Sequence, residues 1–189
     1  MTFDLPKGFQ DKNPNILKKV KEDFKNPDKG FHYLFQGSVG CGKTYLAKLI
    51  AHNLIKSKIV EPKEYLVSAR KTYSSFLETI SSSYTDKGTA IAKLKRSIGS
   101  VEFVILDDLG DEKPNTEASH EYFSSILEDR YDYIGKYPFA RTIITTNLKS
   151  QDFINAYGSR LFDRITDIFT IMKFKEHSFR QENKSVVEG

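Results

Sequence analysis

The chain contains the stretch Gly37-Ser38-Val39-Gly40-Cys41-Gly42-Lys43-Thr44, which fits the pattern G-x-x-x-x-G-K-[ST]. An aromatic-rich run at residues 31–35 precedes it with strand character, and residues 44–55 follow with apolar side chains at helical spacing. Glycines let a backbone turn tightly and approach a polyphosphate, whose oxygens the N–H groups of a helix N-terminus can surround. The stretch therefore predicts a phosphate-binding loop. The alternative, a glycine-rich turn with a surface lysine, is weaker because a strand and a helix flank it.

Two side chains of this loop have expected roles in binding a nucleotide. Lys43 is expected to neutralise charge on the β- and γ-phosphates, and the Thr44 hydroxyl to bind Mg²⁺. Cys41 is the single cysteine, so an intrachain disulfide and a cysteine-based zinc site are excluded, and we interpret it as a spacer. The residues expected to contact the nucleotide are Gly37, Ser38, Val39, Gly40, Cys41, Gly42, Lys43, Thr44 and Tyr45.

Strand and helix patterns alternate along the rest of the chain. Apolar residues at helical spacing predict helices over residues 15–25, 44–55, 69–80, 89–98 and 117–134. Short apolar runs predict strands over residues 31–35, 64–67, 101–106, 140–146 and 169–174. This alternation predicts an α/β fold with a five-stranded parallel sheet and helices on both faces. Ligands of such sheets bind beyond the carboxyl ends of the strands.

Two adjacent carboxylates, Asp107 and Asp108, follow the apolar run at residues 103–106. Core packing does not explain them, because charges are rarely buried without a partner. A divalent metal beside a triphosphate does explain them. We expect Asp107 to bind Mg²⁺ and Asp108 to orient or deprotonate the attacking water. The alternative is a helix or turn cap within residues 109–111.

The next predicted strand ends in Thr145, Thr146 and Asn147. If this strand neighbours the acidic one, Asn147 lies near the γ-phosphate and can hold the lytic water. The alternative is an Asx turn that leads into residues 149–154.

Arg160 and Arg164 are four residues apart, on one face of a short predicted helix. One interpretation is an ordinary surface pair with Asp163 or Asp167. The other is an arginine finger offered to the nucleotide of a neighbouring subunit, where a planar cation stabilises charge on the transferring phosphoryl group.

Together these elements resemble the AAA+ ATPases of the DnaC/DnaI helicase-loader and IstB transposition-helper group. The matching elements are GSVGCGKT, VILDDLG, ITTN, YGSRLFDR and the late His177-Ser178-Phe179-Arg180, and they span about residues 14–182. The resemblance implies an AAA+ type of P-loop NTPase fold with a reduced or absent C-terminal lid.

The resemblance also assigns roles to particular residues. It implies that Lys43 and Thr44 are the Walker A pair, and that Asp107 and Asp108 are the Walker B pair. Asn147 matches sensor 1. Arg164 resembles the finger with Arg160 beside it, and either of them could act in trans. Arg180 resembles sensor 2, which contacts the γ-phosphate.

The domain organisation is expected to be simple. We expect an N-terminal arm and helix at residues 1–29, an AAA+ core at 30–176 and a C-terminal tail at 177–189. Full helicase loaders of this group carry an extra N-terminal domain that grips the replicative helicase, and the residues before the loop strand are too few for one. Partner contacts would then use the segment at residues 3–24, or a part absent from this chain.

Members of the group generally bind single-stranded DNA, and one stretch of this chain has a suitable composition. Cations pair with phosphates and rings stack on bases. The alternative is that Tyr73 and Phe76 pack in the core, and a net charge of +4 is too small to indicate nucleic-acid binding. The candidate residues are Arg70, Lys71, Lys87, Lys93, Lys95 and Arg96, interleaved with Tyr73, Phe76 and Tyr84.

The sequence therefore predicts a Mg²⁺-dependent ATPase that binds ATP, forms a nucleotide-bridged oligomer and assists DNA replication. The expected role is loading a replicative helicase with single-stranded DNA. The alternatives are an IstB-like transposition helper, a small-metabolite kinase, and a nucleotide-dependent binding module with negligible hydrolysis. No apolar run approaches the roughly 18 residues of a membrane span, and residues 1–10 lack a secretory signal. These features predict a cytoplasmic protein without a membrane association.

Overall fold

The computed structural model describes residues 5, 8–26, 28–61, 66–68, 74, 77, 92, 95–96, 98–112 and 116–179. The strands are β1 (His32–Gln36), β2 (Leu66–Ser68), β3 (Phe103–Leu109), β4 (Arg141–Thr146) and β5 (Thr170–Lys173). The helices are α1 (Phe9–Lys12), α2 (Pro14–Asp23), α3 (Lys43–Lys56), α6 (Glu117–Lys136), α7 (Ser150–Tyr157) and α8 (Ser159–Ile168).

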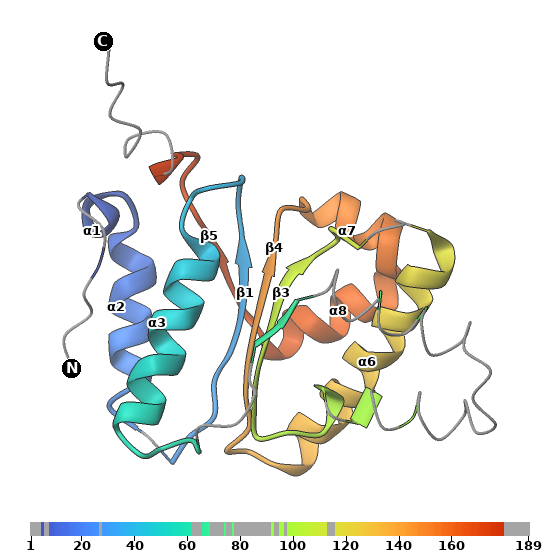
Figure 1. Cartoon of the computed structure of the whole chain (residues 1–189), viewed down its shortest axis with the longest axis horizontal. Coiled ribbons are helices and arrows are strands. Elements are labelled where there is room, and N and C mark those ends of the chain that lie inside the picture. Colours follow the sequence, from blue (N-terminus) through green and yellow to red (C-terminus); the bar gives the residue numbers. More distant parts are fainter. Residues whose placement is uncertain are drawn as a thin grey trace, which may run out of the picture.

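All pairings in the sheet are parallel, and the strand order is β2-β3-β4-β1-β5. The predicted α/β class with a parallel sheet is therefore confirmed. The order places β4 between β1, which leads into the phosphate loop, and β3, which carries the paired acids (Figure 1). Because parallel strands end at the same edge, these polar segments share one edge of the sheet.

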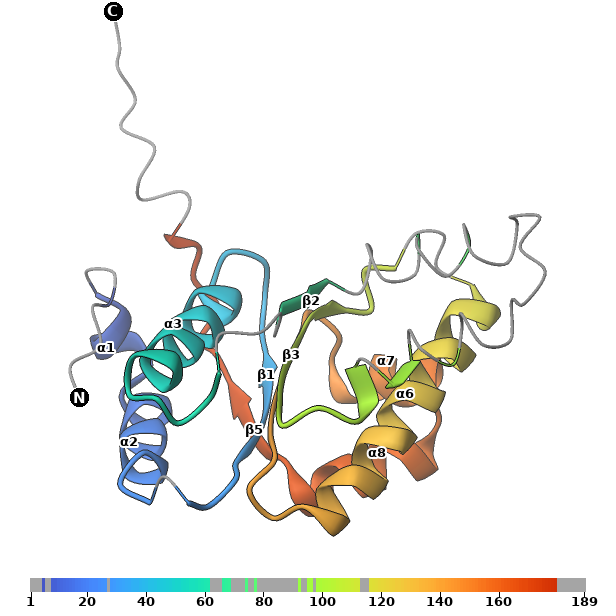
Figure 2. The same ribbon diagram turned by 60° about the horizontal axis from the view of Figure 1, so that its bottom comes forward.

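Strands β1, β3, β4 and β5 alternate their side chains between two separate cores. Tyr33 and Phe35 of β1 pack with α1, α2 and α3 on one face, whereas Leu34 packs with α6, α7 and α8 on the other. Figures 1 and 2 show the two helical layers on opposite sides of the sheet. Strands buried on both faces have near-continuous apolar sequences, which is why the runs at β1 and β3 were recognisable.

Several boundaries differ from the predicted ones. Helix α1 was missed because its four residues are too few to show a period. Helix α7 was also missed, since no helix was predicted for the segment after Asn147. Strand β3 continues to Leu109, beyond the acids, through an irregularity in its pairing with β4. Most of the predicted helices over 69–80 and 89–98 lies outside the described residues.

The arrangement of the terminal segments bears on the predicted domains. Helices α1 and α2 share a core with α3, so the N-terminal segment packs directly on the nucleotide-loop side of the sheet. The boundaries at residues 29 and 176 remain predictions. None of the described helices combines the length and the apolar character needed to cross a membrane.

Candidate nucleotide-binding site

The phosphate loop connects β1 to the first residue of α3 and depends on two left-handed glycines. Gly40 has φ 83° and Gly42, the N-cap of α3, has φ 97°, a region that L-residues rarely adopt. A side chain at Gly42 would meet the Phe9 ring of α1 at 2.6 Å, and one at Gly40 would meet Ser178 Oγ at 2.6 Å. The loop is thus enclosed by segments from both ends of the chain, and Phe179 N donates to Gly40 O at 3.1 Å.

Lys43 is buried, with 5% of its surface exposed, and its ammonium group is held by neutral acceptors. Nζ donates to the carbonyl oxygens of Gly37 and Ser38, each at 2.8 Å. It also donates to Asn147 Oδ1 at 2.8 Å. Hydrogen bonds from a cation to phosphate oxygens are stronger than those to neutral carbonyls. The lysine can therefore exchange these partners for the oxygens of a polyphosphate.

The Thr44 hydroxyl and Asp107 lie side by side. Thr44 Oγ1 donates to Asp107 Oδ1 at 2.8 Å, and Asp107 is 9% exposed. Hydroxyl and carboxylate oxygens are hard ligands of the kind that Mg²⁺ binds, and Mg²⁺ usually adds waters and substrate phosphates to one or two carboxylates. The described residues contain no cluster of three or more His, Cys, Asp or Glu around this point. Such a sparse donor set fits Mg²⁺ beside a triphosphate.

Thr145 organises both acids and was not recognised from the sequence. Its hydroxyl donates to Asp107 Oδ1 at 2.7 Å and accepts from the backbone N–H of Asp108 at 2.9 Å. Thr145 is fully buried in β4, so this contact crosses from β4 to β3. The useful signal was a second threonine before Asn147, but a strand threonine usually indicates only β-propensity.

Asp108 has an unusual backbone conformation. Its φ is 55°, in the left-handed region, and it lies at the irregularity in the β3–β4 pairing. Non-glycine residues held in this region cost about 1–3 kcal/mol and cluster at functional sites. The conformation lets β3 carry Asp107 buried and Asp108 partly exposed at the same strand end.

Gln36 is a second residue that sequence reasoning missed. It ends β1, is 8% exposed, and its Nε2 donates to the carbonyl of Leu148 at 2.6 Å. This bond holds the segment after Asn147 against the strand that leads into the phosphate loop. A glutamine directly before Gly37 carries no distinctive sequence signal.

Comparison with known proteins agrees with this geometry. The family described as IstB-like ATP binding protein matches residues 28–187. The chain belongs to the IstB-like ATP-binding family. No curated protein matches it. The predicted resemblance to AAA+ proteins of the DnaC/IstB group is confirmed by this match and by the fold of DnaC.

Solved structures share the fold of this IstB-like protein. The structure of the DnaC helicase loader is 21% identical, with a TM-score of 0.68 over 90% of this chain and 100% of that chain. Domain III of the Thermotoga maritima replication initiation protein DnaA is 15% identical, with a TM-score of 0.63 over 87% and 62%. AMPPCP-bound DnaA from Aquifex aeolicus is 22% identical, with a TM-score of 0.58 over 90% and 48%.

The loop residues of the IstB-like chain differ in what they can offer a ligand. Val39 and Tyr45 are 64% and 46% exposed, so their side chains can contact a bound nucleotide. Cys41 is completely buried in the core on the α3 face, so only its backbone can face a phosphate. Burial thus supports the interpretation of Cys41 as a spacer.

Among the described residues, the ion pair and the ring contact of Arg164 lie away from the Lys43 site. Arg164 of α8 pairs with Glu128 Oε1 at 3.6 Å, and its guanidinium lies 5.1 Å from the ring centre of Tyr131. Both partners are on α6, across the sheet from α3. Arg160 is exposed, and Arg180 lies outside the described residues.

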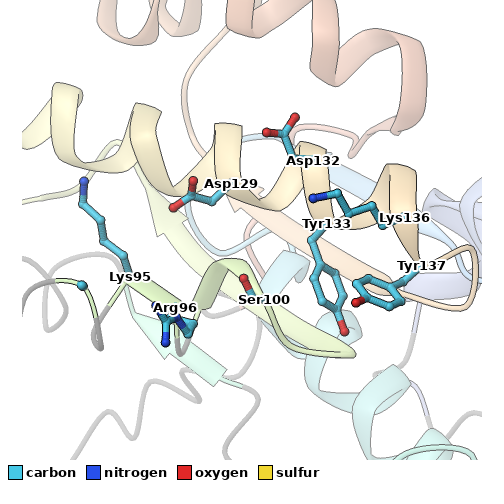
Figure 3. Close-up of a pocket in the computed structure, with 9 residues that line it drawn as sticks. Lys95, Arg96, Ser100, Asp129, Asp132, Tyr133, Lys136 and Tyr137 are labelled. Carbon is cyan, nitrogen blue, oxygen red and sulfur yellow. The ribbon is translucent and has the colours of Figure 1, made fainter. Parts of the chain in front are cut away.

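Of the residues proposed to contact DNA, only Lys95 and Arg96 lie within the described part of the chain. They line a pocket of about 790 Å³ beside α6. Figure 3 shows Lys95 at one end of this pocket and the rings of Tyr133 and Tyr137 at the other. Asp129 and Asp132 also line it, so its charge is mixed. Lys136 lines it too, so three basic side chains accompany the two acidic ones.

Proposed function

We propose that this protein is a Mg²⁺-dependent ATPase of AAA+ type that assists DNA replication. The observation that carries the proposal is the position of Lys43. Its ammonium is held between loop carbonyls and Asn147, beside the Thr44–Asp107 pair. A cation, a hydroxyl–carboxylate pair suited to Mg²⁺ and the neighbouring carboxylate of Asp108 are the groups that hydrolysis of a triphosphate uses, and their grouping supports the proposal.

In this proposal, Lys43 changes partners when ATP binds. Its bonds to Gly37 O and Ser38 O are replaced by bonds to β- and γ-phosphate oxygens, and the loop N–H groups surround the same phosphates. Thr44 and Asp107 hold Mg²⁺, which neutralises charge on the phosphates when it is bound. Thr145 keeps Asp107 oriented for this role.

Asp108 and Asn147 act on the attacking water. The carboxylate of Asp108 accepts a proton as the water oxygen bonds to the γ-phosphorus and the bond to the ADP oxygen breaks, which yields ADP and inorganic phosphate. Asn147 holds the water through its side chain. A carboxylate that accepts a proton in the transition state contributes about 10²- to 10⁴-fold to the rate.

Hydrolysis is measured best by phosphate release with ATP and Mg²⁺ and no other acceptor. Asp108→Asn should lower turnover at least a hundredfold while ATP affinity stays within about threefold, because the amide cannot accept the proton. Asp111→Asn is the matched control and should retain turnover. A wild-type protein that binds ATP tightly without releasing phosphate would instead be a binding module. Phosphate transfer only with an added small acceptor would support a kinase.

We further propose that Arg164, or Arg160 beside it, completes the site of a neighbouring subunit. Arg164 contacts Glu128 and Tyr131 of α6, on the other face of the sheet from α3, and this supports a role toward the nucleotide of a second copy and not toward its own. Lys43→Ala and Arg164→Ala should each abolish turnover, and mixing them should restore part of it. In the mixture, an intact loop from one subunit meets an intact arginine from the other. If mixing restores nothing with either arginine variant, the arginines do not act in trans.

The partner is proposed to be a replicative helicase, with single-stranded DNA bound to the assembly. The structural relatives support this choice, since they include a helicase loader and a DnaA bound to AMPPCP and single-stranded DNA. The family description favours a second candidate, a transposition helper that remodels a transposase–DNA complex. Co-purification with a helicase or with a transposase, in ATP and Mg²⁺, distinguishes the two.

A further inference from the structure

A buried carboxylate just beyond the acidic strand end has no role in the site described so far. Glu112 is completely inaccessible. Its Oε1 accepts from the backbone N–H of Gly110 at 3.0 Å and from the hydroxyl of Tyr157 at 2.9 Å. Its Oε2 is also buried and has no hydrogen-bond partner among the described residues. Burying a carboxylate is costly unless it is well hydrogen-bonded, so a leucine would serve simple packing better.

On one side, Glu112 is connected through the Gly110 turn to the two acids at the end of β3. Gly110 follows Leu109 in the left-handed conformation, with φ 97°, and a side chain there would meet Leu148 at 2.7 Å. Asp111 N donates to the carbonyl of Asp108 at 3.0 Å, which closes a tight turn. The position of Glu112 therefore follows the backbone of Asp108.

The other end is the junction between α7 and α8. Tyr157 is the last residue of α7, and Gly158, with φ 89°, separates it from α8. The Tyr157 ring is packed against Phe153 at 4.8 Å and His120 at 5.4 Å between ring centres. Burial and the neighbouring Glu112 carboxylate raise the Tyr157 pKa well above its usual value, so the hydroxyl stays protonated and donates.

We propose that Glu112 is a positioning residue that connects the acidic end of β3, through Tyr157, to the helix that carries Arg160 and Arg164. The inference rests on the proposed nucleotide site. It adds a physical route within one subunit: a shift of Asp107 and Asp108 on nucleotide binding would move the Gly110 turn, and Glu112 would pass this movement through Tyr157 to the start of α8. Figure 1 shows α7 at the carboxyl ends of β3 and β4, where such a connection must run.

The route can be tested without measuring hydrolysis. Amide hydrogen exchange is measured on the full chain with and without AMPPCP and Mg²⁺. In wild type, the nucleotide should slow exchange at the loop (residues 37–46) and change exchange in α8 (residues 159–168). Tyr157→Phe should keep the loop response and lose the α8 response, because the hydroxyl that bonds Glu112 is removed while the ring is kept. Glu112→Leu should behave in the same way.

Tyr122→Phe is the matched control. Tyr122 is a buried tyrosine of the same core, on α6, whereas the tyrosine hydroxyl that bonds Glu112 is that of Tyr157. This variant should retain both responses. Circular dichroism and thermal unfolding check that each variant is folded, and Tyr157→Phe carries the test if Glu112→Leu does not fold.

The outcomes distinguish a failure of this inference from a failure of the proposed nucleotide site. If Tyr157→Phe keeps the α8 response, or if wild type shows a loop response with none in α8, the inference is overturned and the nucleotide site stands. If the loop itself shows no response to nucleotide, the proposed function fails and the inference fails with it.

A mixing experiment tests the consequence for catalysis. An Asp108→Asn subunit, which is expected to bind ATP without hydrolysing it, can serve as an arginine donor to an Arg164→Ala subunit. Adding Tyr157→Phe to the Asp108→Asn donor should lower the restored turnover about tenfold, whereas adding Tyr122→Phe should leave it unchanged. Equal rescue by both donors would overturn the inference, since a misplaced α8 must be a poor donor.

Discussion

Two buried cations lie at opposite ends of the same parallel strands, and they are satisfied in different ways. At the amino end, Arg130 of α6 is 2% exposed. It donates to Thr142 Oγ1 at 2.8 Å, to Arg141 O at 2.7 Å and to the carbonyl of Val101. At the carboxyl end, Lys43 donates to two loop carbonyls and to Asn147. Among the described residues, neither cation is bonded to a carboxylate.

The difference lies in the geometry of the donors. A guanidinium is a rigid fork, and Arg130 uses it to join α6 to the segments before β3 and β4. Burial lowers the pKa of Arg130 to about 10, so it remains charged at neutral pH. An ammonium is a compact charge on a flexible stem, and Lys43 holds acceptors that a phosphate can replace. Arg130 therefore stabilises the fold, whereas Lys43 is available for a ligand.

The largest expected effect is on chemistry. Lys43→Ala should lower ATP turnover about a thousandfold, roughly 4 kcal/mol, because a preorganised cation at the γ-phosphate is removed. Its thermal midpoint should change little. The exposed Lys48→Ala of the same helix is the control and should keep wild-type turnover. Wild-type turnover in Lys43→Ala would contradict the site.

Arg130→Met should have the opposite effect: it should lower stability and leave nucleotide binding nearly unchanged. It leaves the carbonyls of Val101 and Arg141 buried without their donor, so the free energy of unfolding should fall by about 3 kcal/mol. Nucleotide affinity of the folded fraction should remain within about threefold, measured by titration below the melting range. The exposed Lys136→Met on the same helix should be nearly neutral. If the Arg130→Met variant remained folded but no longer bound nucleotide, the amino and carboxyl ends of the sheet would not be independent.

His32, at the amino end of the sheet, makes the stability of the fold depend on pH. Burial, with Arg130 and Arg141 nearby, lowers the pKa of His32 to about 4 from an ordinary value of 6.5. The unfolded chain therefore binds more protons between these values, and stability falls as the pH decreases through this window. From pH 7.5 to 5 the loss should be about 2 kcal/mol. Denaturant unfolding of His32→Gln should lack this part of the loss, and the exposed His52→Gln should retain it.

The smallest expected effect separates two threonines of one strand. Thr145→Val removes the hydroxyl that bonds Asp107 and should lower turnover about tenfold, roughly 1.4 kcal/mol, with little change in ATP affinity. Thr142→Val, at the other end of β4, removes an acceptor of Arg130 and should lower stability without affecting turnover of the folded protein. Equal effects on turnover would mean that the hydroxyl of Thr145 has no special role.

Much of the site was predictable because its residues are contiguous or follow a strand. The phosphate loop is a local pattern, and two acids after an apolar run are conspicuous wherever the strand lies. Thr145, Gln36 and Glu112 were not predictable, because each is defined by a contact with a residue distant in the chain. An isolated Thr, Gln or Glu has many ordinary uses.

From the chain alone, one could derive the α/β class and the loop glycines and could select Lys43, Thr44, Asp107 and Asp108 as candidate site residues, because short-range spacing and burial periodicity depend on neighbouring residues. The strand order, in contrast, could not be derived from the chain alone. Only folding revealed that β4 lies between β1 and β3 and so brings Asn147 to Lys43. The left-handed Asp108 and the link from Glu112 to Tyr157 also depend on packing between distant segments. Local sequence does not encode such pairings, because they arise when separate apolar faces are buried together.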